Sequence, residues 1–179
     1  FRFTVNSANG DIFIGDVGGG SWEEINKLTP GGNYGYPNVE GMCNCGTYVE
    51  PTYTYSHVVQ YANVDSAISA ISHFTGTAYP QMYADSLFYA DFVRPWMNRL
   101  YFNTASGLWV NEPFMTGLTG IIDLKQGPDG NLYYLAFADD IGATNYVSRI
   151  RYTGGLNRVP TAAIAAAPLF PALHAAVAY

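Results

Sequence analysis

The chain has 179 residues, of which 49% are hydrophobic, 16% aromatic and only 12% charged, and it contains 19 glycines. This balance is typical of many short strands joined by tight turns, and no window shows the sustained 3.6-residue periodicity of a long amphipathic helix. The net charge of −6 excludes the basic surface that nucleic acids or anionic membranes need, and no apolar run predicts a membrane-spanning helix. A surface with few charges suits a secreted protein that handles neutral carbohydrate.

The first predicted elements are short strands. Residues 1–6 alternate in the period-2 sense, and residues 12–14 place β-branched and aromatic side chains between glycine-containing turns. Residues 22–28 alternate again, with Trp22, Glu24 and Asn26 on one side. The segments 12–14 and 22–28 are therefore predicted to pair across a glycine turn.

That turn is the run Gly18-Gly19-Gly20. Residues without a Cβ allow the backbone to approach a ligand closely, so the turn could cradle an anion with its N–H groups or offer carbonyl oxygens to a hard cation such as calcium. A plain tight turn between strands is the structural alternative. The run matches neither dinucleotide nor P-loop spacing, so no nucleotide site is predicted.

An insertion is expected over residues 38–64, and it holds both cysteines, Cys43 and Cys45. Two cysteines one residue apart can close only a small ring, so a bond between them is possible without being the default geometry. A metal site would need two more soft ligands, and none is spaced for it. We favour oxidised, structural cysteines over a redox site.

Beyond the insertion, the pattern predicts strands over residues 67–75, 87–93, 99–103, 108–114 and 121–126. Arg94-Pro95-Trp96 falls between two of them, where an arginine beside a tryptophan could stack on a sugar or simply cover a sheet edge. His57 lies at the end of an aromatic strand over residues 53–57 and is interpreted as structural, whereas His73 could face a channel or a neighbouring sheet. Neither has a serine or carboxylate at a diagnostic spacing, so no hydrolase triad is predicted.

Three aromatic-centred segments echo one another, at residues 11–17, 86–92 and 131–137, with offsets of 75 and 45 residues. This spacing is typical of β-propeller blades, the first of them lengthened by the insertion. The fold class predicted is all-β, with about three blades of four strands each.

The run from Gly10 to Pro37 resembles the glucose/sorbosone dehydrogenase family, which comprises six-bladed propellers of the soluble quinoprotein glucose dehydrogenase type and hedgehog-interacting-protein-like domains. Further motifs in family order are PTYTYSH at 51–57, LFYADF at 87–92, GPDGNLYY at 127–134 and SRIRY at 148–152. The resemblance covers residues 1–155, predicted as a partial propeller. The Ala/Pro-rich residues 156–179 are predicted to be a linker or the start of an immunoglobulin-like module.

The resemblance implies a calcium ion held partly by the backbone carbonyls of Gly18 and Gly19, beneath pyrroloquinoline quinone. It places the family's catalytic histidine before Phe1, and it leaves Arg94 as the candidate substitute for a lysine that contacts the quinone. Two family arginines align with Gly120 and Ile122. Since the quinone carries three carboxylates, the loss of these cations argues against tight binding of pyrroloquinoline quinone. The resemblance also implies that the cysteine pair is an extracellular disulfide.

Two functions follow from these features. The first is the C-terminal part of a secreted sugar dehydrogenase that oxidises an aldose or a similar polyol. The second is a catalytically silent propeller that binds carbohydrate or protein. In both cases we expect the remaining blades to come from another chain, another copy or a missing segment, because a half propeller leaves sheet edges open.

Overall fold

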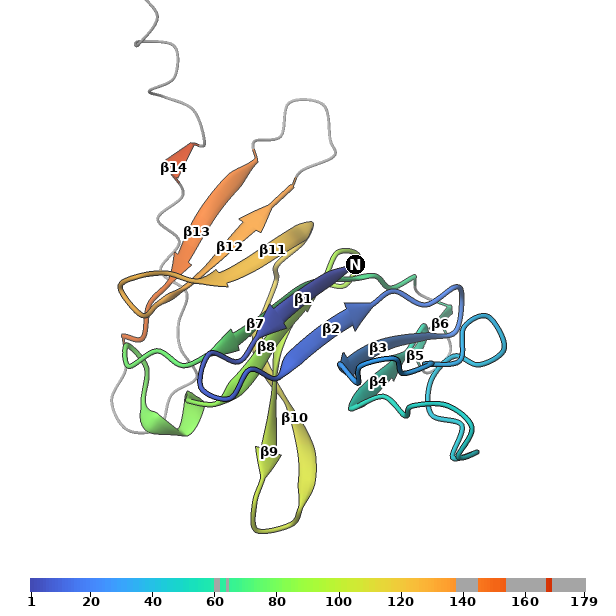
Figure 1. Ribbon diagram of the computed structural model, residues 1–179. Helices are drawn as coiled ribbons and strands as arrows, with labels where there is room; N and C mark the ends of the chain where they lie inside the picture. Colours follow the sequence, from blue (N-terminus) through green and yellow to red (C-terminus); the bar gives the residue numbers. More distant parts are fainter. Residues whose placement is uncertain (60–61, 64, 138–144, 154–166, 169–179) are drawn as a thin grey trace, which may run out of the picture.

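The computed structural model describes residues 1–59, 62–63, 65–137, 145–153 and 167–168, and these form three four-stranded antiparallel sheets (Figure 1). The first sheet contains β1 (Arg2–Val5), β2 (Ile12–Asp16), β3 (Trp22–Lys27) and β4 (Tyr53–Ser56). The second contains β7 (Ile68–Phe74), β8 (Ser86–Asp91), β9 (Trp96–Asn103) and β10 (Leu108–Thr116). The third contains β11 (Ile121–Gln126), β12 (Leu132–Ala136), β13 (Tyr146–Ile150) and β14 (Ala167–Pro168).

The sheets are arranged as neighbouring blades of a propeller. Within each sheet the strands lie in chain order, and the first strands meet: β1 packs against β7, and β7 against β11. The later strands of each sheet spread outward from this centre (Figure 1). The three echoing segments become β2, β8 and β12, the second strand of each separate sheet. The prediction of an all-β partial propeller is confirmed.

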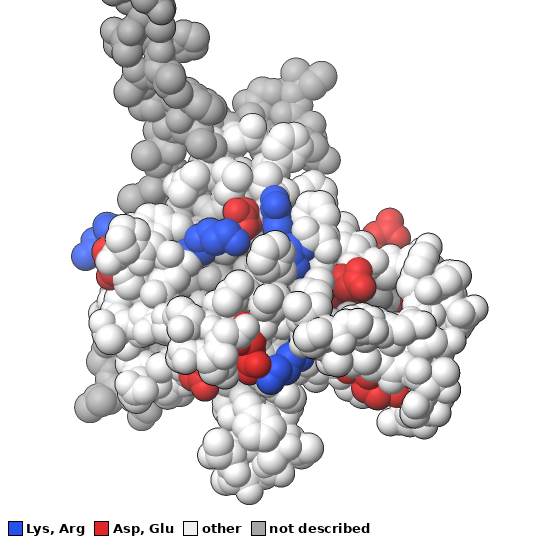
Figure 2. All heavy atoms as spheres, viewed as in Figure 1, with Lys and Arg blue, Asp and Glu red and all other residues white. Residues whose placement is uncertain are grey.

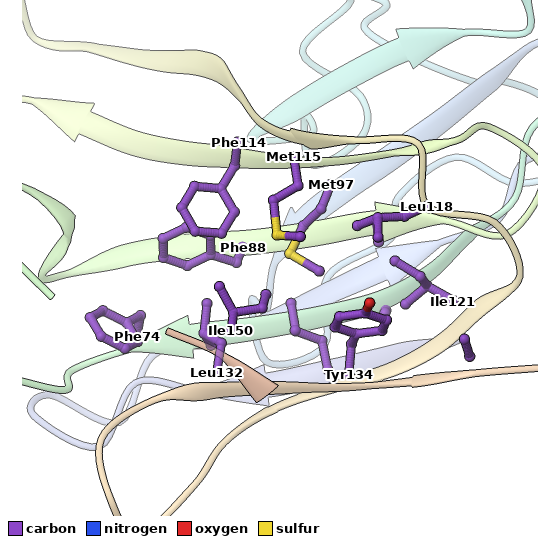
Figure 3. Packing of buried hydrophobic residues seen from close by; sticks show 14 of the residues in the cluster. Phe74, Phe88, Met97, Phe114, Met115, Leu118, Ile121, Leu132, Tyr134 and Ile150 are labelled. Carbon is purple, nitrogen blue, oxygen red and sulfur yellow. The ribbon is translucent and has the colours of Figure 1, made fainter. Parts of the chain in front are cut away.

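Two hydrophobic cores lie between the sheets, because β7, β8 and β9 of the second sheet bury side chains on both faces. One core joins the first and second sheets and contains Phe13, Ile25, Tyr55, Ile68, Ile71, Leu87, Tyr89 and Leu100. The other joins the second and third sheets, where Phe74, Phe88 and Phe114 from one side meet Leu132, Tyr134 and Ile150 from the other (Figure 3). Aromatic and β-branched side chains fill the space between the sheets, and their burial removes apolar surface from water.

Several boundaries differ from those predicted. β4 falls inside the expected insertion and completes the first sheet, and the hairpin of β5 (Val58–Val59) and β6 (Ala62–Asn63) follows it. Trp96 begins β9 instead of lying in a turn. A short 3-10 helix, η1 (Gln81–Tyr83), was not predicted, because one helical turn leaves no periodicity to detect.

The predicted linker at residues 156–179 lies outside the described residues apart from β14. There, Ala167 and Pro168 pair with Val147 and Tyr146 of β13. The division of the chain at residue 155 therefore stays a prediction. Among the described residues, no helix is long and apolar enough to cross a membrane.

One face of the first sheet is open at its inner strands. Phe3 and Val5 of β1 are 61% and 47% exposed, and Ile12 and Ile14 of β2 lie beside them. These side chains point away from the core between the first two sheets, since Phe13, which alternates with them, is buried in it. The apolar face of β1 and β2 thus has no cover among the described residues.

Candidate functional site

The glycine turn Gly18-Gly19-Gly20 connects β2 to β3 and encloses a carboxylate of the protein itself. Oε1 of Glu40 accepts the N–H of Gly19 at 2.8 Å, and Oε2 accepts the N–H groups of Ser21 at 2.8 Å and Trp22 at 3.3 Å. Desolvation at the turn raises the pKa of Glu40, but the backbone hydrogen bonds together outweigh it and hold this pKa below 4.5. The anion that the turn cradles is therefore a side chain from the following loop.

The carbonyl oxygens of Gly18 and Gly19, unlike the N–H groups of the turn, have no hydrogen-bond partner among the described residues. Both glycines line a cavity of about 240 Å³ beside the turn. The cavity is also lined by three carboxylates and two tyrosines, namely Asp16, Glu24, Glu40, Tyr34 and Tyr36, and by Val17 and Val39. This arrangement favours a cation over an anion.

A second carboxylate, Glu23, ties the turn to the neighbouring sheet. Glu23 is fully buried on β3, its Oε1 lies 2.6 Å from Nε2 of His57, and its Oε2 accepts the N–H of Ile68 in β7 at 2.7 Å. The N–H of Gly18 approaches the same Oε1 at 3.3 Å. Burial raises the pKa of Glu23, although the hydrogen bonds from Ile68 and His57 oppose the shift.

Arg94 lies at the same end of the blades and is already engaged. Its Nη2 donates to the carbonyl of Ser56 at 2.6 Å, and its guanidinium lies 5.5 Å from the ring centroid of Tyr55. The backbone N–H of Arg94 donates to Oδ1 of Asp91 at 2.8 Å, while Oδ2 of Asp91 accepts the hydroxyl of Tyr55 at 2.8 Å. Nε of Arg94 is buried and has no hydrogen-bond partner among the residues that the structure describes.

The structure therefore brings Gly18, Gly19, His57 and Arg94 to one end of the first two blades. Arg94 binds Ser56 at the end of β4, and the next residue, His57, shares the carboxylate of Glu23 with Gly18. His73 lies elsewhere, at the other end of β7, where its Nε2 is 2.9 Å from Oδ1 of Asp85. Glu23 and Glu40 were missed by sequence reasoning. Period-2 alternation assigns Glu23 to one face of its strand but does not identify its partners. Glu40 lies 21 residues from Gly19, and no sequence motif links the two positions.

Cys43 and Cys45 form a disulfide, with their Cα atoms 5.2 Å apart. Glu50 lies beside it and accepts the N–H of Cys43 at 3.1 Å. The pairing that the sequence left open, and that the family resemblance implied, is thus present. Together with Glu50, the cysteines are the one group of three side-chain metal ligands found in the described part of the chain. Sulfurs bonded to each other are not thiolate ligands, so this group has no metal-binding form in the oxidised protein.

On the face that Figure 2 shows, lysines, arginines and carboxylates lie scattered within a mostly uncharged surface. Tyr36, at the cavity, is 77% exposed.

Comparison with known proteins agrees with this architecture. The family model for glucose / sorbosone dehydrogenase matches residues 3–143, and the chain belongs to this family. Comparison with curated protein sequences gives no match.

Three solved structures show the same fold. A protein from Thermus thermophilus, provisionally assigned as a glucose dehydrogenase, is 24% identical with a TM-score of 0.63, and the match covers 82% of this chain and 42% of that one. The aldose sugar dehydrogenase from Streptomyces coelicolor, with pyrroloquinoline quinone bound, is 17% identical with a TM-score of 0.63 and coverages of 82% and 41%. The soluble aldose sugar dehydrogenase from Escherichia coli, in its apo form, is 21% identical with a TM-score of 0.56 and coverages of 74% and 40%. The chain thus spans about two fifths of the length of these structures.

The described residues differ in how well they fit the two ligands that the resemblance implies, calcium and pyrroloquinoline quinone. Two carbonyls that accept no hydrogen bond from a described residue, beside carboxylates, are oxygen ligands of the kind that calcium takes. Pyrroloquinoline quinone does not fit these residues by themselves, because its three carboxylates need cations. The cavity presents carboxylates instead, and Arg94 is committed to Ser56 and Tyr55.

Proposed function

We propose that this chain is the C-terminal part of a secreted sugar dehydrogenase of the quinoprotein type, in which the whole propeller oxidises an aldose or a similar polyol. The observation that carries the proposal is the glycine turn of a family propeller: Gly18 and Gly19 line an acid-lined cavity, and their carbonyl oxygens accept no hydrogen bond from the described residues. In this proposal the carbonyls of Gly18 and Gly19 hold calcium. Arg94 is a candidate contact to the quinone even though its Nη2 donates to Ser56, and most cationic partners of the quinone come from other blades.

The residues of this chain have defined tasks in the proposed site. Glu23 holds the turn against β7 through Gly18 and Ile68. Nε2 of His57 forms a hydrogen bond with the buried carboxylate of Glu23, so this nitrogen is not free to take a substrate proton. We therefore assign no catalytic residue to the chain, and the proton acceptor belongs to the preceding blades. The cofactor, when bound, would supply the site that receives the hydride.

The open apolar face supports the proposal that further blades complete the ring. The exposed sheet face is of the kind that a neighbouring blade covers, and it consists of Phe3, Val5, Ile12 and Ile14. We propose that the preceding blades of the same protein cover this face. The share of the related structures that the chain spans supports this choice. Size-exclusion chromatography of the 179-residue chain should show self-association, and a compact, soluble monomer would refute the proposal.

The enzyme proposal is tested by reconstituting the complete protein with pyrroloquinoline quinone and calcium and measuring dye-linked oxidation of aldoses. Turnover that depends on both additions is the expected result, and its absence would remove the enzyme function. Secretion is tested by fractionating the native cells, with the protein expected outside the cytoplasm. The disulfide and the weakly charged surface support that location.

A second function is supported by one specific observation. The described cavity carries carboxylates where a quinone site needs cations, and the exposed ring of Tyr36 beside it could stack on a sugar. A catalytically silent propeller that binds carbohydrate would have these features. Glycan-array binding by the complete protein without turnover would select this function over the first.

A further inference from the structure

Glu40 is the residue whose position explains the glycine turn. It lies in the loop between β3 and β4, and both of its carboxylate oxygens are occupied by amides of the turn: Gly19 on Oε1, Ser21 and Trp22 on Oε2. A carboxylate with both oxygens bonded in this way is held in one orientation. Its carboxylate therefore fixes the amides of the turn, and Glu40 also lines the cavity beside Gly18 and Gly19.

The amides that face Glu40 determine where the carbonyls point. In a trans peptide, the C=O of one residue lies opposite the N–H of the next. The N–H of Gly19 points at Glu40, so the carbonyl of Gly18 points away from it. Glu40 thereby orients the carbonyl of Gly18, which accepts no hydrogen bond from a described residue.

The absence of a side chain at Gly19 is what admits Glu40. A Cβ built on Gly19 would lie 2.6 Å from Oε1 of Glu40, whereas a Cβ on Gly20 would meet nothing within 4 Å. Amides that donate to an anion also become more polarised, so their carbonyl oxygens become better ligands for a cation. Because Glu40 also lines the cavity, its negative charge adds to the attraction for a positive ion there.

We propose that Glu40 is a positioning residue for a calcium site: it binds the N–H groups of Gly19, Ser21 and Trp22 and so fixes the turn whose Gly18 and Gly19 carbonyls would hold the ion. This inference rests on the proposed calcium site and assigns to Glu40 the task of holding the turn in place. Glu50 offers a matched control, because it is an exposed carboxylate in the same loop and contacts Cys43 instead of the turn.

The test measures calcium affinity of the complete protein by isothermal titration calorimetry, with no substrate or quinone present. Glu40→Ala should weaken calcium binding about tenfold or more, as loss of an outer-shell partner does at other metal sites. Glu40→Gln, which keeps the size and one acceptor, should show a smaller loss, and Glu50→Gln should bind calcium as the wild type does.

The outcomes separate this inference from the proposed function. If the wild type binds calcium and Glu40→Ala binds it equally well, the positioning role is refuted and the calcium site stands. If the wild type binds no calcium, the site and the inference are refuted together. Thermal unfolding without calcium identifies a merely structural role, in which the melting temperature of Glu40→Ala falls while its calcium affinity is unchanged. If Glu40→Ala does not fold, the affinity of Glu40→Gln decides.

Discussion

Replacing Glu23 by alanine removes the acceptor that joins the first two blades at the end where the glycine turn lies. The change leaves two buried donors without a partner, the N–H of Ile68 and Nε2 of His57. A buried donor without an acceptor costs about 1–3 kcal/mol. The third donor, the N–H of Gly18, is 3.3 Å away and adds little.

The net loss is smaller than the sum of the maximum costs, because burying Glu23 is itself unfavourable, as the raised pKa of this carboxyl shows. We therefore expect Glu23→Ala to lower the free energy of unfolding by about 3 kcal/mol. Glu23→Gln keeps the shape and one acceptor, so about half of that loss is expected. Glu50→Gln, at an exposed position, should stay within about 0.5 kcal/mol of the wild type.

The assay is urea unfolding followed by tryptophan fluorescence, repeated across pH. Since the folded state raises the pKa of Glu23 above its ordinary value of 4.5, the folded protein holds this proton more tightly than the unfolded chain does. The stabilising contribution of that proton is complete below pH 4.5 and is lost as the pH rises through the folded pKa. Glu23→Gln should abolish this part of the pH dependence. A loss below about 1 kcal/mol in Glu23→Ala would refute the role of Glu23 as the joint between blades.

Two further predictions concern the turn and the opposite end of the blades. A Cβ on Gly18 would collide with the backbone carbonyl of Trp22, so Gly18→Ala should lower the free energy of unfolding by about 2 kcal/mol. A Cβ on Gly20 meets open space, so Gly20→Ala should be nearly neutral, and equal urea midpoints for the two variants would contradict this prediction. Burial lowers the pKa of His73 below 6.5 despite its contact with Asp85. The contribution of His73 to stability should therefore be complete above pH 6.5 and be lost as the pH falls through the folded pKa. Thermal melts of His73→Gln should lack this pH dependence.

Much of the fold follows from local pattern. Alternation of apolar and polar residues places β2, β11 and β12 close to their observed bounds, because each is a short strand between strong turn signals. For β4 the pattern predicted only the end of an aromatic strand at residues 53–57, within the expected insertion, and its pairing with β3 depends on the tertiary structure. Arg94 was singled out as a candidate contact to the quinone, and no local pattern predicted its hydrogen bond to Ser56, a residue 38 positions earlier.

Composition, the turn glycines and the repeated aromatic strands were sufficient to indicate an all-β chain of propeller blades, since strand alternation and turn chemistry act over a few neighbouring residues. The partners of Glu23 and Glu40 were decided only when the sheets packed and the loop between β3 and β4 folded over the glycine turn. Hydrogen bonds of a few ångströms between residues 45 and 21 positions apart depend on the path of the whole chain, and no local spacing encodes them.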